Sequence, residues 1–561
     1  MFGTLTHSES PATQLHAPQG GLLLSRVLVL LGFASQVAVA WYFRSLTWDD
    51  SAITLGFART FAATGRIEPT PGSGIVEGYS TTLWMLLMAA AAKLLRSPAG
   101  VLAFAKIATL ALNLVNIVLI RSWLCRWQPE ILANLVAGTM GCTLMLYETI
   151  NGMETPLLLS LIFIMLLLAS HRNRTCRLLY LLAGCALLLV RFEAVWLLVP
   201  FILAERPTRQ ALTSAATWTS ALIASSIVRI WYFGSFVPNT IIAKRGPPYS
   251  ASTAHGEFYR HLAEAVTISK YIAPYLLISI ALYIYCSFRR SEERAPSGHE
   301  AGGAIAPFRF SVIFALFSIF LSVAIGQNWG PTLRSFYPGA PILLALALLP
   351  MRSFLTSERA ARLAVAAICL CSVLRLGARV HEMSMPDGPI YMPYATVDDV
   401  GVTSGVLRDI QKATHQHDLL FAGPDMGAVM LYSDGIRIID LGLLCDPVLA
   451  RKRYQAIDSY VLEQRRPDVI EVHGRWSELT RLSNYPYFES NYQPVYVDGT
   501  RMFVKRQLIA QIDPQRLRDA TFSATGHVPG EKPFYTKVDF TLNQHFGHYL
   551  LLDVEGRSSL H

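Results

Sequence analysis

The chain has 561 residues, of which 52% are hydrophobic and only 16% are charged, and its mean hydropathy is +0.36. Soluble globular proteins carry about 25% charged residues, whereas apolar runs of roughly 15 to 25 residues recur here until about residue 377. These properties exclude a soluble enzyme, a disordered chain, a coiled coil and a secreted disulfide scaffold. They favour a polytopic α-helical membrane protein with one polar domain attached.

The cysteines and the net charge narrow the class further. Seven of the eight cysteines lie in or beside apolar segments, and only Cys445 lies in the polar C-terminal part, which therefore has no internal disulfide. The formal net charge is +9. Because Lys and Arg cluster between apolar runs, we interpret this charge as phosphate recognition and cytoplasmic loops, and we expect no nucleic-acid partner.

Residues 1–20 form a polar tail, which is followed by the apolar run 21–43. This run imitates a secretory signal peptide, but it is longer than a signal core and continues through Trp41, so we predict an uncleaved anchor. Ten more segments complete a membrane domain over 21–380 with about eleven transmembrane helices. These segments are 100–121, 131–150, 155–170, 177–190, 194–204, 211–230, 268–288, 308–326, 336–350 and 361–379.

The apolar run 80–96 could cross the membrane or lie along its surface. If it lies on the surface and the N-terminus is cytoplasmic, the basic loops 121–126, 171–177, 205–209, 288–294 and 351–362 all fall inside, as the positive-inside rule expects. We therefore predict a multi-pass protein of the bacterial inner (plasma) membrane. Its first external loop, 44–99, and its C-terminal domain lie outside the cytoplasm.

From about residue 391 the pattern changes to short apolar strands alternating with helices. Strands are predicted at 419–423, 436–441 and 468–473, helices at 426–432 and 448–463, and a hairpin with an Asp-Gly turn at 494–504. This alternation indicates a small extracytoplasmic α/β domain over 391–561. Beyond Gln511 the chain is polar and aperiodic, and no element is predicted.

The first external loop carries two adjacent carboxylates, Asp49 and Asp50, directly after the first span, in the segment TWDDSAITLGFAR (47–59). One of the pair could simply cap the helix predicted at 51–62. Alternatively, the pair could supply a general base or bridge a divalent cation where a lipid-borne substrate presents its head group. The residues alone favour neither interpretation.

This loop, with VEGYSTTLW (76–84) further along, resembles the first loop of bacterial GT-C glycosyltransferases, above all arabinofuranosyltransferases of the mycobacterial cell-wall type and related pilin-modifying enzymes. Further similar motifs follow in order: NGMETP (151–156), RFEA (191–194), FVPNTIIAK (236–244), GQNWGPTLRSFYP (326–338), and DMGAVMLY through IDLGLLCDP (425–447). The sequence departs from the family at Phe192, where Pro is commoner, and at Asn328, where Asp is commoner. Asn328 is therefore given no acid role.

The resemblance implies an inverting displacement with a polyprenyl-phosphate sugar as donor, in which an acidic residue of the first loop deprotonates the acceptor hydroxyl. We expect Asp50, with Asp49 as its close rival, to be this base. The remaining expectations follow from their positions on external loops. Lys244, Arg245 and Arg334 bind the donor phosphate, with contact to lipid head groups as the alternative. The residues expected to bind the sugar or the acceptor, with structural roles as the alternative, are Glu77, Tyr79, Glu154, Asn239 and Trp329.

Three further questions stay open at this stage. Arg191 and Glu193 are expected to pair and close a helical hairpin. A divalent cation at Asp49 and Asp50 is one alternative, whereas His415 and His417 in a polar loop are a weak metal motif. The predicted activity is transfer of arabinofuranose to an extracytoplasmic glycan or protein; transfer of mannose or another hexose, and a flippase of lipid-linked sugars, are the rival functions.

Overall fold

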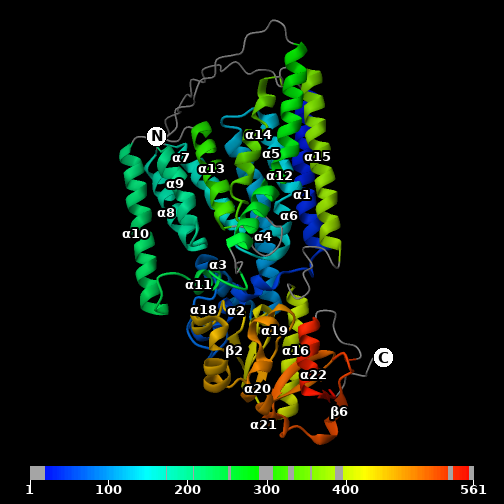
Figure 1. Cartoon of the computed structure of the whole chain (residues 1–561). Coiled ribbons are helices and arrows are strands. Elements are labelled where there is room, and N and C mark those ends of the chain that lie inside the picture. Colours follow the sequence, from blue (N-terminus) through cyan, green and yellow to red (C-terminus); the bar gives the residue numbers. More distant parts are fainter. Residues whose placement is uncertain are drawn as a thin grey trace.

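The computed structural model describes residues 19–171, 173–205, 208–249, 254–289, 307–325, 334–353, 355, 357–385, 396–528 and 535–554. It has two parts, a bundle of long helices and a domain built around a mixed sheet (Figure 1). Helices α2 (Asp49–Thr64), α3 (Thr82–Leu95) and α11 (Asn239–Ala243) lie where the two parts meet.

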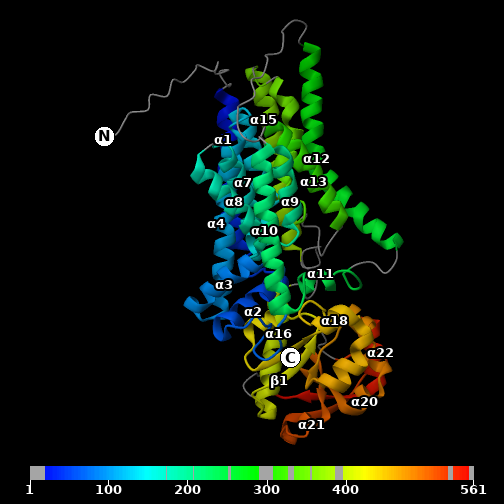
Figure 2. The ribbon, with the colours of Figure 1, turned by 90° about the vertical axis from the view of Figure 1, so that its left-hand side faces the viewer.

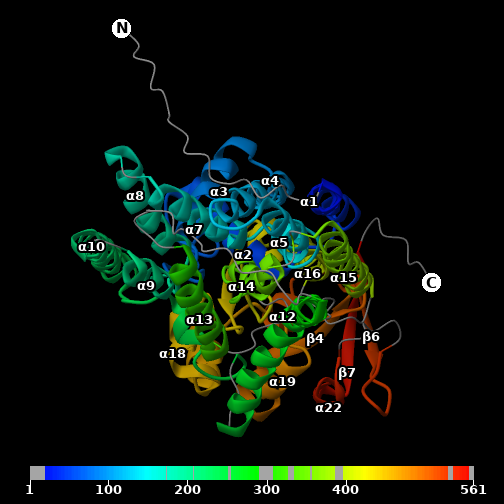
Figure 3. The ribbon, with the colours of Figure 1, turned by 90° about the horizontal axis from the view of Figure 1, so that it is seen from above.

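Every segment predicted to span the membrane is helical in the described part of the chain. Viewed along the bundle, α14 lies near the centre and α10 at the periphery (Figure 3). The helices are α1 (Gln19–Tyr42), α4 (Pro98–Leu124), α5 (Glu130–Cys142) with α6 (Met145–Asn151), α7 (Thr155–Ala169), α8 (Arg174–Val190), α9 (Ala194–Ala204), α10 (Thr208–Phe233), α12 (Ala254–Arg289), α13 (Pro307–Ile325), α14 (Ala340–Ala347) with the 3₁₀ turn Leu349–Ser353, and α15 (Glu358–Ser384).

The helices differ in how much of a membrane they could cross. Within the described residues, six are long and apolar enough to span, and the pair α5 and α6, bent by 45°, makes a seventh. Helix α7 has 15 residues, which corresponds to about 22 Å against a hydrocarbon core of about 30 Å. The bundle therefore combines full spans with shorter helices; α8, α9 and α14 are the others of this kind.

The described parts of the basic loops gather at the end of the bundle that is remote from the C-terminal domain. Glu130 at the start of α5 pairs with Arg121 at 2.6 Å and with Arg26 of α1 at 3.1 Å. Nearby, Arg126 donates a hydrogen bond to the carbonyl of Leu167, at the end of α7. The acidic and basic residues singled out in the external loops lie at the opposite end, beside the sheet domain.

The apolar run 80–96 forms α3, whose 14 residues reach only about 21 Å, in agreement with a helix that does not span. Together with α2 it packs against the C-terminal domain. Phe57 of α2, Trp84 of α3 and Phe421 and Met430 of the C-terminal domain belong to one buried apolar cluster. The first external loop is therefore part of the core of the C-terminal domain and fixes that domain to the bundle (Figure 2).

The C-terminal domain begins with α16 (Val397–Thr414) and contains a seven-stranded sheet of order β2-β1-β3-β5-β4-β7-β6. Strand β1 pairs in parallel with β2 and β3, and β3 pairs antiparallel with β5. The strands are β1 (Leu419–Gly423), β2 (Ile436–Asp440), β3 (Val469–Ile470), β4 (Tyr492–Val497), β5 (Thr500–Lys505), β6 (Leu517–Thr521) and β7 (His548–Leu552). The helices between them are α17 (Gly427–Tyr432), α18 (Pro447–Lys452), α19 (Arg475–Thr480), α20 (Pro486–Asn491), α21 (Arg506–Ile509) and α22 (Lys537–Phe546), with 3₁₀ turns at Leu482–Asn484 and Pro514–Arg516.

One prediction for this domain was wrong, and one segment for which no element was predicted is structured. The single helix predicted at 448–463 is broken into α18, a 3₁₀ turn (Arg453–Ala456) and a π-helix (Ile457–Arg465). The break falls at Arg453, which has φ +56° and donates hydrogen bonds to the carbonyls of Ile242 and Ala243 in α11. The segment beyond Gln511, for which no element was predicted, forms β6, α22 and β7, because β7 completes the sheet beside β4.

Candidate functional site

Asp49 joins the first external loop to the C-terminal domain. Its side chain is 6% exposed, and its two carboxylate oxygens accept hydrogen bonds from the backbone N–H groups of Gly427 and Ala428, each at 2.7 Å. Burial and the nearby Asp425 raise the pKa of Asp49 well above its usual range, and the two N–H donors oppose this effect. Asp49, the first residue of α2, therefore caps α17 with both of its carboxylate oxygens.

Asp50 is the adjacent residue of α2, and its side chain is exposed at the junction. It lies close enough to Lys244, Asp425 and Tyr249 to perturb the pKa of each. The side chains of Asp49 and Asp50 thus point in different directions, because successive positions of a helix are about 100° apart. One is bound to the backbone and the other is available to a ligand.

Lys244 supplies the positive charge that faces Asp50. It follows α11, and its side chain is exposed to solvent although protein groups surround it. Exclusion of bulk water lowers the pKa of Lys244; the cations Arg191 and Arg334 act in the same direction, whereas Asp50 and Glu193 oppose them. Opposite charges from separate elements therefore converge here in a partly desolvated space.

A cluster of two arginines and two glutamates lies on the bundle side of this space. The Nη2 atom of Arg334 is 2.7 Å from Oε1 of Glu154, and Nη1 of Arg191 is 3.4 Å from the same oxygen. Arg191 also bonds Glu193 at 2.9 Å, as expected for the hairpin between α8 and α9. Glu154 is 1% exposed, so it holds the arginines and is not free to bind a sugar.

Beside this cluster is a small, partly open cleft. One end of the cleft is charged, and the rest of its wall is largely aliphatic. Such a surface suits an apolar chain that ends in an anion. The lining includes Arg191, Arg334, Leu158, Leu197, Leu321 and Ile325.

Glu77 and Tyr79 are buried in contacts between elements of the chain. Glu77 is 3% exposed and pairs with Arg229 of α10 at 3.0 Å. Tyr79 is 2% exposed and packs against Phe57, with ring centroids 5.0 Å apart. Both residues therefore hold the first external loop in place, which is the structural alternative that the sequence left open.

Asn239 is likewise a structural contact. Its amide donates hydrogen bonds to the carbonyls of Leu443, at 3.2 Å, and Leu444, at 2.8 Å, and so ties α11 to the loop after β2. Arg245 has an exposed side chain, with no ion pair to another described residue. Trp329 lies outside the described residues.

The sequence interpretation missed Asp425, Glu471 and His473. Asp425 comes shortly after β1, and Glu471 and His473 come directly after β3. Since β1 and β3 are parallel neighbours, their carboxyl ends share one edge of the sheet, and the predicted strands could have suggested this meeting. The Nε2 atom of His473 lies 3.3 Å from Asp425, and Nδ1 lies 2.8 Å from Glu471.

The described residues contain no group of three or more His, Cys, Asp and Glu side chains that could hold a metal ion. Asp49 also does not fit a bridging ligand, because both of its oxygens accept backbone N–H groups. Among the described residues, Lys244, Arg191 and Arg334 bring positive charge to this site.

No protein-family model matches the chain, and no curated protein matches it. Among solved structures, ArnT from Cupriavidus metallidurans in the apo state superposes with a TM-score of 0.54 and 12% identity, over 87% of this chain and 99% of that chain. The same enzyme bound to undecaprenyl phosphate gives a TM-score of 0.48, 14% identity and coverage of 88% and 99%. An oligosaccharyltransferase of Archaeoglobus fulgidus gives a TM-score of 0.48 and 11% identity, over 86% of this chain and 74% of that chain. The chain therefore has the fold of GT-C membrane glycosyltransferases.

Proposed function

We propose that this protein is an inverting glycosyltransferase that moves a sugar from a polyprenyl-phosphate donor to a hydroxyl group of an acceptor. The observation that carries the proposal is the convergence of Asp50 and Lys244 beside the arginines at the charged end of the apolar cleft. The fold shared with ArnT supports the same class of reaction.

The reaction needs a base on one side of the sugar and cations on the other. Asp50 takes the proton of the acceptor hydroxyl as its oxygen forms a bond to the anomeric carbon. The bond between that carbon and the phosphate oxygen breaks, and the phosphate leaves with the electron pair. Lys244 and Arg334 stabilise this developing negative charge, with Arg245 as a further candidate on the same loop as Lys244.

The cleft and its arginines account for the donor class. The aliphatic wall suits an isoprenoid chain, whereas Arg334 and Arg191 suit the phosphate that terminates it. Glu154 holds both guanidinium groups in position before a ligand arrives, which reduces the entropy that binding costs.

The sugar and the acceptor are inferred from the sequence motifs. The order of the motifs from TWDD to DMGAVMLY favours arabinofuranose as the transferred sugar and an extracytoplasmic glycan or protein as acceptor. Mannose or another hexose is the rival within this class. The buried positions of Glu77, Tyr79 and Asn239 make them supports of the site, while Trp329 keeps its proposed stacking role.

We place the site on the outer face of the bacterial inner membrane. The described parts of the basic loops gather at one end of the bundle and the site lies at the other, so the positive-inside rule favours a site outside the cytoplasm. A cysteine introduced at Asn173 in a cysteine-free background should react only with membrane-permeant reagents. Labelling by an impermeant reagent in intact cells would reverse the orientation.

The activity is tested by incubating the purified protein with a panel of polyprenyl-phosphate sugars and candidate acceptors, with and without EDTA. We expect free polyprenyl phosphate and a glycosylated product, both lost in Asp50→Asn. A flippase would move the intact lipid and release no polyprenyl phosphate, so donor movement without release would favour that rival. Loss of activity with EDTA, restored by a divalent cation, would show a metal requirement.

A further inference from the structure

The C-terminal domain presents a chain of three polar side chains to the junction with the bundle. Asp425 follows β1, and its carboxylate accepts a hydrogen bond from Nε2 of His473 at 3.3 Å. The other ring nitrogen, Nδ1, lies 2.8 Å from Glu471. His473 and Glu471 are 8% and 9% exposed, whereas the side chain of Asp425 is 28% exposed. The chain thus runs from the interior of the domain to an accessible carboxylate.

His473 lies between two carboxylates in this chain. A histidine between two carboxylates donates from both nitrogens only as the cation. Burial disfavours this cation, but Glu471 and Asp425 outweigh the burial and raise the pKa of His473 to about 10. Burial, Glu471 and Asp50 raise the pKa of Asp425, and the imidazolium of His473 limits this rise.

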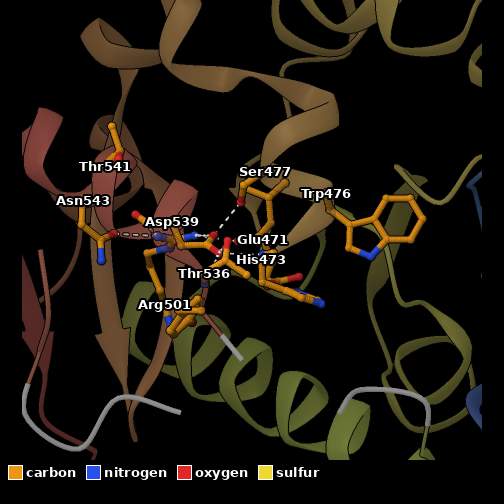
Figure 4. A network of polar contacts seen from close by, with 12 residues as sticks. Glu471, His473, Trp476, Ser477, Arg501, Thr536, Asp539, Thr541 and Asn543 are labelled. Carbon is orange, nitrogen blue, oxygen red and sulfur yellow. Dashed lines mark hydrogen bonds and ion pairs between the residues drawn. The ribbon is translucent and has the colours of Figure 1, made fainter. Parts of the chain in front are cut away.

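A second, fully buried network fixes the backbone on both sides of His473 (Figure 4). The carbonyl of Val472 accepts a hydrogen bond from Arg501 at 2.7 Å, and the N–H of Gly474 donates to Asp539 at 2.6 Å. Arg501 and Asp539 pair at 2.8 Å and are both 0% exposed. His473 therefore has a defined position whether or not a ligand is present.

Asp425 is fixed in the same way from its other side. Asp49 binds the N–H groups of Gly427 and Ala428, the second and third residues after Asp425. Because Asp50 is the residue after Asp49, the first external loop thus sets the position of Asp425 relative to Asp50.

The surroundings of Asp425 indicate the kind of ligand that it can bind. Asp49 and Asp50 approach it from α2, Tyr249 from the loop after α11, and Glu471 and His473 from its own domain. An anionic phosphate is repelled by this group of carboxylates and is attracted to the arginines of the bundle. A neutral polyol, in contrast, donates hydroxyl hydrogen bonds to carboxylates.

We propose that Asp425 is the carboxylate with which the C-terminal domain holds a hydroxyl group of a polyhydroxylated acceptor beside Asp50, and that His473 is the residue that positions it. The inference rests on the proposed function for the reaction, because Asp50 is the base in that function. It assigns the two partners to opposite sides of the junction, the donor to the bundle and the acceptor to the domain.

Binding can be measured separately from turnover. Saturation-transfer NMR with methyl α-arabinofuranoside and methyl α-mannoside as probes is applied to the purified full-length protein and its variants. Asp425→Asn replaces a charged carboxylate by a neutral amide, and it should weaken binding of at least one probe by roughly 10- to 100-fold. His473→Gln should weaken it less and should move the loss of binding on acidification to higher pH, since the counter-cation of Asp425 is absent.

His545 provides a matched control in the same domain, because it pairs with Glu489 on the exposed surface. His545→Gln should leave binding and its pH dependence within about twofold of wild type. Circular dichroism and size-exclusion profiles establish that each variant is folded.

The possible results separate the inference from the proposed function. Equal binding by wild type and Asp425→Asn, or no binding of either probe by wild type, overturns the role of Asp425. An unshifted pH profile in His473→Gln overturns the positioning role. Binding that depends on Asp425, without release of polyprenyl phosphate from any donor, supports the acceptor site and overturns the proposed transferase activity.

Discussion

Adjacent carboxylates with different surroundings should respond differently to the same substitution. In Asp49→Asn the amide keeps one acceptor oxygen, but its NH₂ group faces a backbone N–H of Gly427 or Ala428, which it cannot bind. In Asp50→Asn no hydrogen bond to another described residue is removed, and only the proton-accepting oxygen of the base is lost. We therefore expect Asp49→Asn to affect stability and Asp50→Asn to affect catalysis.

The contacts give the size of each effect. Asp49 accepts two hydrogen bonds of 2.7 Å in a buried position, and a hydrogen bond to a charged group contributes about 1.5–3 kcal/mol. Loss of one such bond, with one buried donor left unpaired, lowers the free energy of unfolding by about 2–4 kcal/mol. For a cooperative unit of the size of the C-terminal domain this is a decrease in Tm of about 5–15 °C. Loss of a general base lowers kcat by about 10²- to 10⁴-fold.

The assay combines thermal unfolding in detergent with release of polyprenyl phosphate. Both are measured at about pH 8 to keep Asp49 ionised, because burial raises its pKa. Asp50→Asn should keep the wild-type Tm within about 2 °C, and Asp49→Asn should retain turnover below its own lowered Tm. An inactive Asp49→Asn of normal Tm together with an active Asp50→Asn would refute the reasoning.

Further predictions concern the phosphate, the loop contact and the buried histidine. Lys244→Met should raise the KM for the donor by about 10- to 100-fold, measured with labelled donor, and a larger effect of Arg245→Met would place the phosphate elsewhere. Glu77→Gln should destabilise the protein by about 3–5 kcal/mol, because Arg229 keeps a buried charge without a counter-ion; an unchanged Tm would contradict this. His473 has a folded pKa of about 10, so its stabilisation is complete below its unfolded pKa of about 6.5 and is lost as the pH rises through the folded value. Wild-type Tm should therefore fall more steeply than that of His473→Gln between these two pH values.

The helical bundle could be predicted from the sequence, because membrane-spanning helices satisfy their own backbone hydrogen bonds and must be apolar. Apolar runs such as 100–121 can therefore be recognised as membrane spans without reference to the rest of the chain. Strands 419–423 and 436–441 were predictable for a related reason, since each is a short buried run between turn residues. The polar strand β6, with largely exposed residues, has no such local signature, and only its pairing with β7 defines it.

The candidate site was predicted in part. Asp50, Lys244 and Arg334 were selected from loops at one end of the predicted bundle. In the structure, Asp50 and Arg334 both lie close enough to Lys244 to change its pKa. Glu154 was expected to bind the sugar because it lies in the same loops. It instead pairs with Arg334, a residue 180 positions away, and no sequence pattern reports such a partner.

The sequence by itself determined which segments are apolar enough for lipid, which end of the bundle is basic and which loops carry acids. These are properties of composition and local periodicity, so they require no partner. Only the tertiary structure decided what each acid does. Asp49 and Asp50 are chemically identical neighbours, and their difference arises because α17 places two N–H groups against one of them and leaves the other beside Lys244. Charge and hydrogen bonding depend on contacts between distant segments, and folding alone creates those contacts.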